Sequence, residues 1–372
     1  MNGDIVSQAG DPAKVVVAMS GGVDSSLAAA LLVEQGYEVI GLMLRLWAED
    51  GAPANRCCAP DAQREARRVA EQLGIPFYVR DCRELFKRSV VDPFLTAYAR
   101  GLTPNPCITC NERVRFGHLL NEARALGAQF LATGHYARLR RSASGQIELL
   151  KGCDPDKDQS YVLYRLTQTQ LAHVMFPLGA YHKREVRALA QARQLPVHSR
   201  PDSQDLCFLG NRGDYRQFIA HHLPEVLQPG PIEDSSGRVL GQHTGLANYT
   251  VGQRKGLGMS ARQPWYVLRL EPARNALIVG TAAALGRREL SAGQMTYISS
   301  RPPLEPLMVS AKIRYRAVEV PALLVPLPGA RAHLRFEQPL RDITPGQSVV
   351  LYQGEVVLGG GVIEPDDRQV NG

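Results

Sequence analysis

The sequence predicts an α/β protein in which a doubly wound parallel sheet is followed by a small central domain and a C-terminal all-β barrel. In the first half, short apolar runs alternate with helix-length amphipathic segments, which is the rhythm of a parallel α/β sheet. The first run, KVVVAM (14–19), is apolar throughout, as expected of a strand buried on both faces. From about residue 286, short β-like runs separated by Pro and Gly indicate the barrel. We therefore expect domains at 1–212, 213–285 and 286–372.

The elements of the first domain follow one another with short turns between them. After a glycine turn, DSSLAAALLVEQG (24–36) predicts a helix that ends at its glycine. The later elements expected here are a strand at 38–46, a helix at 61–74, a strand at 76–81, a helix at 111–127 and a strand at 128–137. Ligands of such sheets bind at the carboxyl ends of the strands, so the loops there are the expected site.

The pattern changes after about residue 212. A short helical piece (211–227) precedes Gly/Pro/Ser-rich turns and the loop HTGLANYTVGQRKGLG (243–258). The β-like runs of the barrel are MVSAKIRY, AHLRFEQPL and SVVLYQGEVVLGGGVIE, which alternate with turn-forming residues.

Composition narrows the class of protein. A chain of 372 residues with 44% hydrophobic and 21% charged residues is typical of globular proteins of two or three domains. It has no run of about 18 apolar residues, so we expect no membrane span. The start, MNGDIVSQAGDPAK, lacks the features of an export signal, and residues 1–13 are expected to be disordered. The net charge of +7 permits a polyanionic partner without requiring one.

Seven scattered cysteines do not form the even framework of a secreted, disulfide-rich protein. They are typical of a reducing compartment, and we expect a cytoplasmic protein with a few reactive thiols. Cys57 and Cys58 are adjacent, which suits neither a simple disulfide nor a metal pair, and Cys82 and Cys153 stand alone. These four are interpreted as structural or incidental.

The most specific short motif is AMSGGVDSS (18–26), where the first strand turns into the first helix. Gly21 and Gly22 allow close backbone approach, Ser20 and Ser25 bring hydroxyls, and the helix N-terminus favours an anion. No Gly-Lys-Ser/Thr follows, so this is not the lysine-containing phosphate loop. The alternative, a Gly-Ser turn that only caps a helix, is disfavoured by the strand–loop–helix context. The motif resembles the signature of the PP-loop ATP pyrophosphatases, which implies a Rossmann-like domain that adenylates a carbonyl oxygen and releases pyrophosphate.

Cysteines also stand in two loop-like segments. TPNPCITCNER (103–113) carries Cys107 and Cys110, which could form a metal clip, a redox disulfide, or a nucleophile with an incidental neighbour. Because a helix is expected to begin at Asn111, Cys110 is predicted to have a lowered pKa. Cys207 lies in RPDSQDLCFLGNRGDY, among polar and turn-forming residues.

A longer series of motifs narrows the family. SGGVDSS, TPNPCITCN, ATGHYAR, KDQSYVLY, DSQDLCF, TVGQRKGLG and TPGQSVVLYQGEVVLGGGVIE occur in one order over residues 14–365. In this order they resemble the tRNA-specific 2-thiouridylases, which convert the wobble uridine of tRNA to 2-thiouridine. The resemblance implies that ATP, with Mg²⁺, adenylates the uridine C2 oxygen. It also implies Cys110 as nucleophile and Cys207 as persulfide carrier, loaded by a sulfur-relay protein or a cysteine desulfurase. A transient disulfide would then join these two cysteines.

The resemblance also implies binding residues. It places ATP binding at Ala18, Met19, Ser20, Gly21, Gly22, Val23, Asp24, Ser25, Leu44 and Gly134. It places the contact with the target base at Asn105, Pro106 and Cys107. Further tRNA contacts are implied at Lys157, Asp158, Gln159, Arg314 and Tyr315. Arg254 and Lys255, between glycines, form a basic loop suited to RNA phosphates, although any single basic residue can be a solvated surface charge. His135 is a candidate catalytic group, or an orienting or packing residue.

Some relatives carry Asp where Cys107 stands here. Because this chain has a cysteine at that position, Cys107, Cys110 and Cys207 together offer three thiolates. Three thiolates could hold an iron–sulfur cluster, which would supply the sulfur in place of the persulfide. Zinc is a weaker option, since no fourth ligand is evident. Two further readings stay open: a PP-loop synthetase that adenylates a small molecule, and a non-enzymatic RNA- or metal-binding protein.

Overall fold

The computed structural model describes residues 12–47, 60–202, 206–209, 214–259 and 264–366. Of residues 1–13, which were expected to be disordered, residues 1–11 lie outside these ranges, and so do Cys57 and Cys58. The chain forms two compact units, Met1–Ser89 with Cys107–Asn211, and Val90–Pro106 with Arg212–Gly372.

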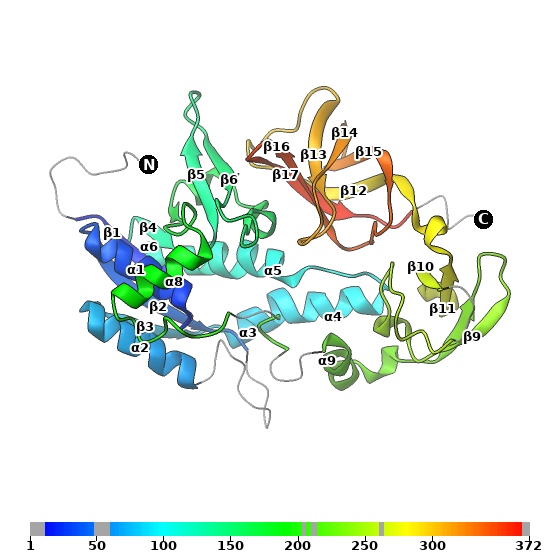
Figure 1. The fold of residues 1–372 in the computed structure, drawn as a ribbon, viewed down its shortest axis with the longest axis horizontal. Helices are drawn as coiled ribbons and strands as arrows, with labels where there is room; N and C mark the ends of the chain where they lie inside the picture. Colours follow the sequence, from blue (N-terminus) through cyan, green and yellow to red (C-terminus); the bar gives the residue numbers. More distant parts are fainter. Residues whose placement is uncertain (1–11, 48–59, 203–205, 210–213, 260–263, 367–372) are drawn as a thin grey trace. The chain divides into compact units, whose positions relative to one another are not determined.

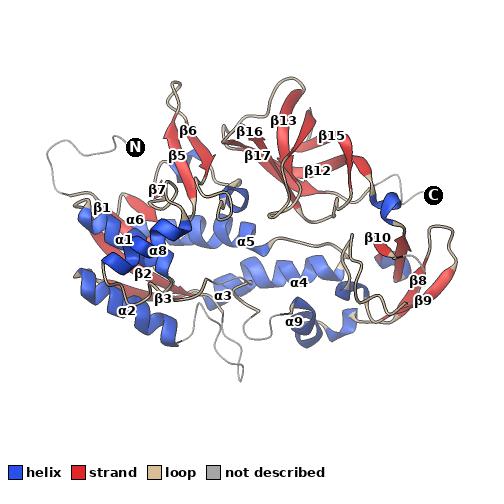
Figure 2. Ribbon diagram, viewed as in Figure 1, coloured by secondary structure: helices blue, strands red, loops and turns tan. Residues whose placement is uncertain are grey.

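The first unit contains a parallel sheet with the strand order β3-β2-β1-β4-β7 (Figures 1 and 2). Its strands are β1 Lys14–Ala18, β2 Glu38–Arg45, β3 Phe77–Asp81, β4 Phe130–Ala132 and β7 Val174–Met175. Neighbouring strands are paired in parallel throughout this sheet. The strand order reverses next to β1, and such a reversal opens a crevice at the carboxyl ends of the strands.

Three helices pack on this sheet and share its apolar core: α1 Val23–Glu34, α2 Pro60–Leu73 and α8 Lys183–Ala192. The three strands and two helices expected between residues 14 and 81 are confirmed, with each end within two residues of the predicted position. Three further helical stretches of the chain are short: α3 Arg83–Phe86, α6 Leu120–Ala125 and α7 Gln168–Leu171. The remaining strands of this unit form a hairpin of β5 Ala137–Arg141 and β6 Ile147–Lys151.

The helix expected to begin at Asn111 begins five residues earlier. It runs without a break through α5 Pro106–Thr109, the π-helix η2 Cys110–Leu119, and α6. Proline is well suited to the first turn of a helix, where its missing N–H would have no partner. The proline that looked like part of a loop therefore starts the helix.

The second unit holds two β structures and the helices α4 Asp92–Ala99 and α9 Tyr215–His222. The first is a small sheet of order β10-β11-β8-β9, made of Tyr266–Glu271, Ala276–Gly280, Gly230–Glu233 and Val239–His243. The second is a closed antiparallel barrel in which β12 pairs with both β15 and β17. Its strands are β12 Arg287–Tyr297, β13 Leu307–Lys312, β14 Val320–Leu327, β15 Arg331–Leu340, β16 Ser348–Gln353 and β17 Val356–Ile363. The predicted fold class is confirmed.

Candidate active site

The loop between β1 and α1 has the backbone shape that the sequence predicts for an anion cradle. Gly21 has a φ of +73°, and a Cβ placed on it would lie 2.3 Å from the carbonyl oxygen of Ala62 in α2. Both observations exclude a side chain here. The loop is therefore pressed against α2, which fixes the position of its N–H groups.

Serine hydroxyls organise this loop from within. Ser25 Oγ accepts a hydrogen bond from the Ser20 N–H at 3.1 Å and lies 3.3 Å from Ser20 Oγ. The hydroxyls of Ser25 and Ser26 donate to the Gly22 carbonyl at 3.2 and 2.9 Å. Gly22 is the N-cap of α1 and has no side chain to cap it. The helix thus presents its N-terminus, with its positive dipole end, toward the space that the loop frames.

Leu44 and Gly134 lie at the same edge of the sheet as the loop. Ala18, the last residue of β1, pairs with Leu42, so half-buried Leu44 lies two residues further toward the carboxyl end. Gly134 follows β4 by two residues, and a Cβ there would lie 2.9 Å from the Ser25 nitrogen. The backbone that follows β4 therefore meets the start of α1, and Leu44 lies at the same edge of the sheet, where a nucleotide is expected.

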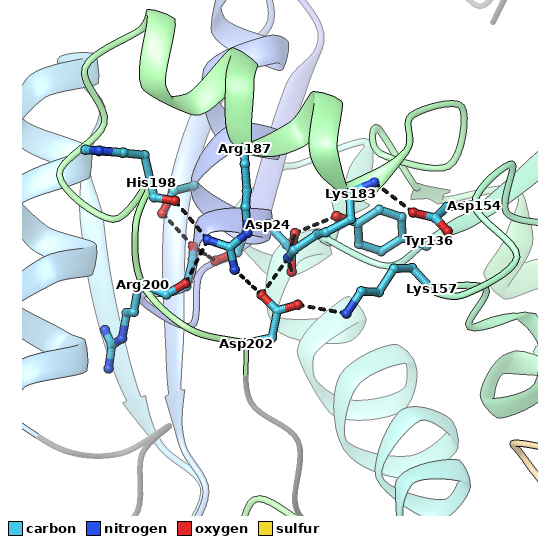
Figure 3. A network of polar contacts seen from close by, with 12 residues as sticks. Asp24, Tyr136, Asp154, Lys157, Lys183, Arg187, His198, Arg200 and Asp202 are labelled. Carbon is cyan, nitrogen blue, oxygen red and sulfur yellow. Dashed lines mark hydrogen bonds and ion pairs between the residues drawn. The ribbon is translucent and has the colours of Figure 1, made fainter.

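Asp24, in the first turn of α1, is held by two groups that come from distant parts of the chain (Figure 3). The Lys183 ammonium lies 2.7 and 2.8 Å from its two carboxylate oxygens, and the Tyr136 hydroxyl donates to it at 2.7 Å. Burial and the neighbouring Asp24 charge raise the pKa of Tyr136, so its hydroxyl keeps its proton. The side chain of Asp24 is thus held in place beside the loop by Lys183 and Tyr136.

The position of Cys110 in its helix differs from the one that the sequence predicts. Cys110 does not lie at a helix N-terminus, because the helix begins at Pro106; it lies in the second turn and is 6% exposed. Burial raises the pKa of the Cys110 thiol, and the Arg115 guanidinium opposes this only in part. The expected lowering of its pKa is wrong for this structure. Cys107 lies in the first turn and is exposed.

Cys207 lies in the short described segment 206–209 and is half-buried. The next residue, Phe208, is 2% exposed, and its ring centroid is 6.0 Å from that of Phe86 at the end of α3. Because α3 directly follows the carboxyl end of β3, this aromatic contact anchors Cys207 near the edge of the sheet that carries the nucleotide loop.

His135 is buried between aromatic rings rather than presented to a ligand. Its Nδ1 is 2.8 Å from Thr133 Oγ1, and its ring contacts those of Phe116 and Phe176. Burial, with a contribution from Arg115, lowers its pKa to about 3, so the ring is neutral at physiological pH.

A group of metal-binding side chains is not found in the described part of the chain, where no three His, Cys, Asp or Glu residues are placed to hold an ion together. The three thiols of the cluster hypothesis all lie in that part, Cys110 buried and Cys107 exposed. In this arrangement they do not fit an iron–sulfur cluster.

Lys157, Asp158 and Gln159 occupy one tight loop after β6. The Lys157 ammonium is 2.8 Å from Asp202 Oδ2. Asp158 is buried, and its carboxylate accepts hydrogen bonds from the N–H groups of Gly152 and Ser160 and from the Ser160 hydroxyl. The Gln159 amide oxygen accepts from the Tyr136 N–H at 3.0 Å. Hydrogen bonds therefore hold this loop in place, and it contacts Tyr136 and Asp202 near Asp24.

In the second unit, Asp342 brings two of the predicted RNA-contacting segments together. It forms an ion pair with Arg314, and a Cβ on Gly252 would lie 2.4 Å from its Oδ1. Arg254 and Lys255, which follow Gly252, are both exposed. The glycine loop of the small sheet and the β13–β14 connection of the barrel thus share one positively charged neighbourhood.

Comparison with known proteins bears directly on this arrangement. Three family models match consecutive parts of the chain: a tRNA methyl transferase HUP domain at 13–211, a tRNA methyl transferase PRC-barrel domain at 216–281 and an aminomethyltransferase beta-barrel domain at 287–363. The tRNA-specific 2-thiouridylase of Moorella thermoacetica is 53% identical over 353 residues, which cover 94% of this chain and 99% of the relative. That of Roseiflexus castenholzii is 50% identical over 371 residues, 95% of this chain and all of the relative.

The chain belongs to the tRNA-specific 2-thiouridylase family. Among solved structures, the U34-tRNA thiolase of Methanococcus maripaludis aligns over 57% of this chain and 65% of that one, with 21% identity and a TM-score of 0.33. That likeness is too remote to bear on function.

Sequence reasoning missed three residues that this family member places around the nucleotide loop. Tyr136 and Asp202 stand inside the motifs ATGHYAR and DSQDLCF, but nothing in those motifs indicates that they approach Asp24. Lys183 begins an amphipathic helix, KREVRALAQA, whose apolar spacing would have predicted α8. That pattern predicts a helix, not the ion pair at its first residue.

Proposed function

We propose that the protein catalyses the ATP-dependent 2-thiolation of the wobble uridine of tRNA. The observation that carries the proposal is the likeness to curated 2-thiouridylases over nearly the whole chain. The strand–loop–helix site supports it, because such a loop suits the pyrophosphate part of ATP. The protein is accordingly a tRNA-uridine 2-sulfurtransferase.

In the first step, the uridine C2 oxygen attacks the α-phosphorus of ATP, and pyrophosphate leaves. We assign ATP binding to residues 18–25 together with Leu44 and Gly134, which line one edge of the sheet. The loop N–H groups and the start of α1 would hold the departing pyrophosphate. The Asp24 carboxylate is the kind of oxygen ligand that Mg²⁺ takes together with nucleotide phosphates.

In the second step, sulfur replaces the adenylated oxygen. Cys207 carries a persulfide. Because burial raises the pKa of Cys110, its thiol must first lose its proton, and the neighbouring Arg115 guanidinium favours the thiolate. The Cys110 thiolate then attacks the Cys207 sulfur, forming a disulfide between the two cysteines. The outer sulfur leaves with the electron pair, bonds to C2, and displaces AMP. The disulfide requires the two Cα atoms to approach within about 7 Å, and a thiol reductant must then reduce it.

We assign tRNA contacts to the two groups of predicted residues. Asn105, Pro106 and Cys107 would meet the target base; Lys157, Asp158 and Gln159, with Arg254, Lys255, Arg314 and Tyr315, would contact the tRNA. The exposure of Arg254 and Lys255 supports their part in this, whereas buried Asp158 would act by shaping its loop.

The sulfur reaches Cys207 from a sulfur-relay protein or a cysteine desulfurase, in a cytoplasm that keeps thiols reduced. None of the helices in the described part of the chain is long and apolar enough to cross a membrane.

One other mechanism of the same thiolation, and two other functions, make different predictions. A cluster on Cys107, Cys110 and Cys207 would require iron and acid-labile sulfide in anaerobically purified protein. A small-molecule synthetase would release pyrophosphate without tRNA. A non-enzymatic RNA-binding protein would release none.

The proposal predicts a specific product from ATP, unmodified tRNA and a persulfide-loaded donor. We expect pyrophosphate release that depends on tRNA, and a wobble nucleoside whose mass rises by the difference between sulfur and oxygen. A mass increase of one methylene would instead indicate methylation. Absence of tRNA-dependent pyrophosphate release, with the donor present, would overturn the proposal.

Removing charge from the glycine loop is expected to weaken tRNA binding without changing ATP binding. For Arg254→Ala/Lys255→Ala we expect roughly tenfold weaker tRNA binding, because about two contacts to phosphate are lost. The slope of log K against log salt should fall by about one for each lost contact. Filter binding across a salt series measures both quantities.

The control for this prediction is Arg238→Ala/Arg335→Ala, which removes the same charge from exposed side chains of the same unit. Equal weakening in both double variants would show that only net charge matters and that the loop makes no specific contact.

A further inference from the structure

One carboxylate next to the nucleotide loop gathers three cations. Asp202 Oδ2 is 2.8 Å from the Lys157 ammonium, while its Oδ1 is 2.7 Å from an Arg187 nitrogen and 3.0 Å from the Lys183 ammonium (Figure 3). These cations come from the loop after β6 and from two turns of α8. Asp202 therefore links the loop after β6 to α8 through ion pairs.

Lys183 is shared between Asp202 and Asp24. It bridges the two carboxylates, and its side chain is only 11% exposed. An exposed ion pair contributes little to the stability of the folded state. A partly buried cation that loses one of its two partners is still desolvated, and the lost interaction no longer offsets the cost of that desolvation. The position of Lys183 thus depends on both carboxylates.

The segment that carries Asp202 is also fixed to the nucleotide loop, through the side chain of Arg200. Arg200 donates a hydrogen bond to the Gly21 carbonyl at 2.8 Å. Arg187 donates to the carbonyls of His198 and Arg200 at 3.0 and 3.1 Å. Asp202 is held in place independently of Lys183, so it can act as the fixed partner of that lysine.

The charges of the group explain why two carboxylates are needed. When a polyphosphate enters the loop, it competes with Asp24 for the Lys183 ammonium. With Asp202 present, Lys183 remains anchored at one side while its contact with Asp24 changes. Without Asp202, Lys183 has no second carboxylate to anchor it, and Lys157 and Arg187 lose the carboxylate that they share with it.

We propose that Asp202 is a positioning residue of the adenylation step, which holds Lys183 at the mouth of the nucleotide loop and acts through it. The inference rests on the proposed function. Partial burial acts to raise the pKa of Asp202, but hydrogen bonds and charge interactions with Lys157 and Lys183 outweigh it and lower this pKa to about 2. The carboxylate is therefore charged throughout the pH range in which the enzyme can be assayed.

The test is Asp202→Asn, which removes the charge and keeps the shape of the side chain. We expect tRNA-dependent pyrophosphate release at saturating ATP to fall at least tenfold. The Kd of ATP, measured by calorimetry, should stay within about twofold or tighten, because removal of a negative charge does not repel a polyanion. Asp202→Glu, which restores the charge, should recover part of the rate.

The matched control is Glu34→Gln, which breaks an ion pair of 2.6 and 2.7 Å with Arg193, just beyond α8, in the same unit. Both its rate and its ATP affinity should match the wild type. An equal loss of rate and ATP affinity in Asp202→Asn, or no loss of either, would overturn the inference. Wild-type protein that releases no pyrophosphate with tRNA would instead refute the proposed function.

Discussion

Replacement of Cys110 or Cys207 with serine is expected to abolish 2-thiouridine formation while pyrophosphate release with tRNA persists. Adenylation of the C2 oxygen uses no thiol, so ATP is still consumed, and the activated uridine returns to uridine by hydrolysis. Sulfur delivery needs both cysteines, because one carries the persulfide and the other supplies the electron pair that releases its outer sulfur. Mass analysis of the wobble nucleoside, beside a pyrophosphate assay, separates the two steps.

Cys153→Ser is the control, because Cys153 is an exposed thiol of the same unit without a proposed role. It should thiolate tRNA like the wild type. Full thiolation by Cys207→Ser would show that the persulfide resides elsewhere. Loss of bound iron in Cys107→Ser, together with loss of thiolation, would support the cluster mechanism instead.

The strand, glycine turn and helix around residues 18–26 could be predicted from the sequence because their signals are local. A buried strand, two glycines and the start of a helix are adjacent in the chain, and each has its own sequence pattern. The helix that carries Cys110 was placed less well, since Pro106 is compatible with both a loop and a first helical turn. That shift reversed the predicted direction of the pKa of Cys110, from lowered at a helix N-terminus to raised by burial.

The ion network around Asp24 could not be predicted from sequence. Asp24 and Lys183 are 159 positions apart, and their contact exists only because α1 and α8 pack on the same sheet. Charged residues at the ends of amphipathic helices are usually solvated, and no pattern in KREVRALAQA distinguishes its first lysine. Only the three-dimensional arrangement identifies the residue.

The second large effect is expected from Gly21→Ala, which should abolish ATP binding. An alanine at a φ of +73° costs about 1–2 kcal/mol, because left-handed backbone crowds the Cβ. In addition, this Cβ would lie 2.3 Å from the Ala62 carbonyl oxygen, and backbone of a packed helix cannot move aside cheaply. The loop must therefore shift away from α2, which misplaces the N–H groups that we assign to the pyrophosphate.

Two glycines of the same strand–loop–helix unit separate this effect from a general loss of stability. Gly36 has a φ of +84° with nothing within 4 Å of a Cβ, so Gly36→Ala bears the backbone cost alone. Gly22 has a φ of −98°, and a Cβ there would make an ordinary 3.5 Å contact with Ser20 Oγ.

We expect Gly36→Ala to lower the free energy of unfolding by about 1 kcal/mol and to bind ATP normally. Gly22→Ala should bind ATP more tightly than Gly21→Ala. If Gly21→Ala bound ATP with wild-type affinity in calorimetry, the loop would not be the pyrophosphate site, because no small adjustment relieves a clash between the new Cβ and the backbone of a packed helix.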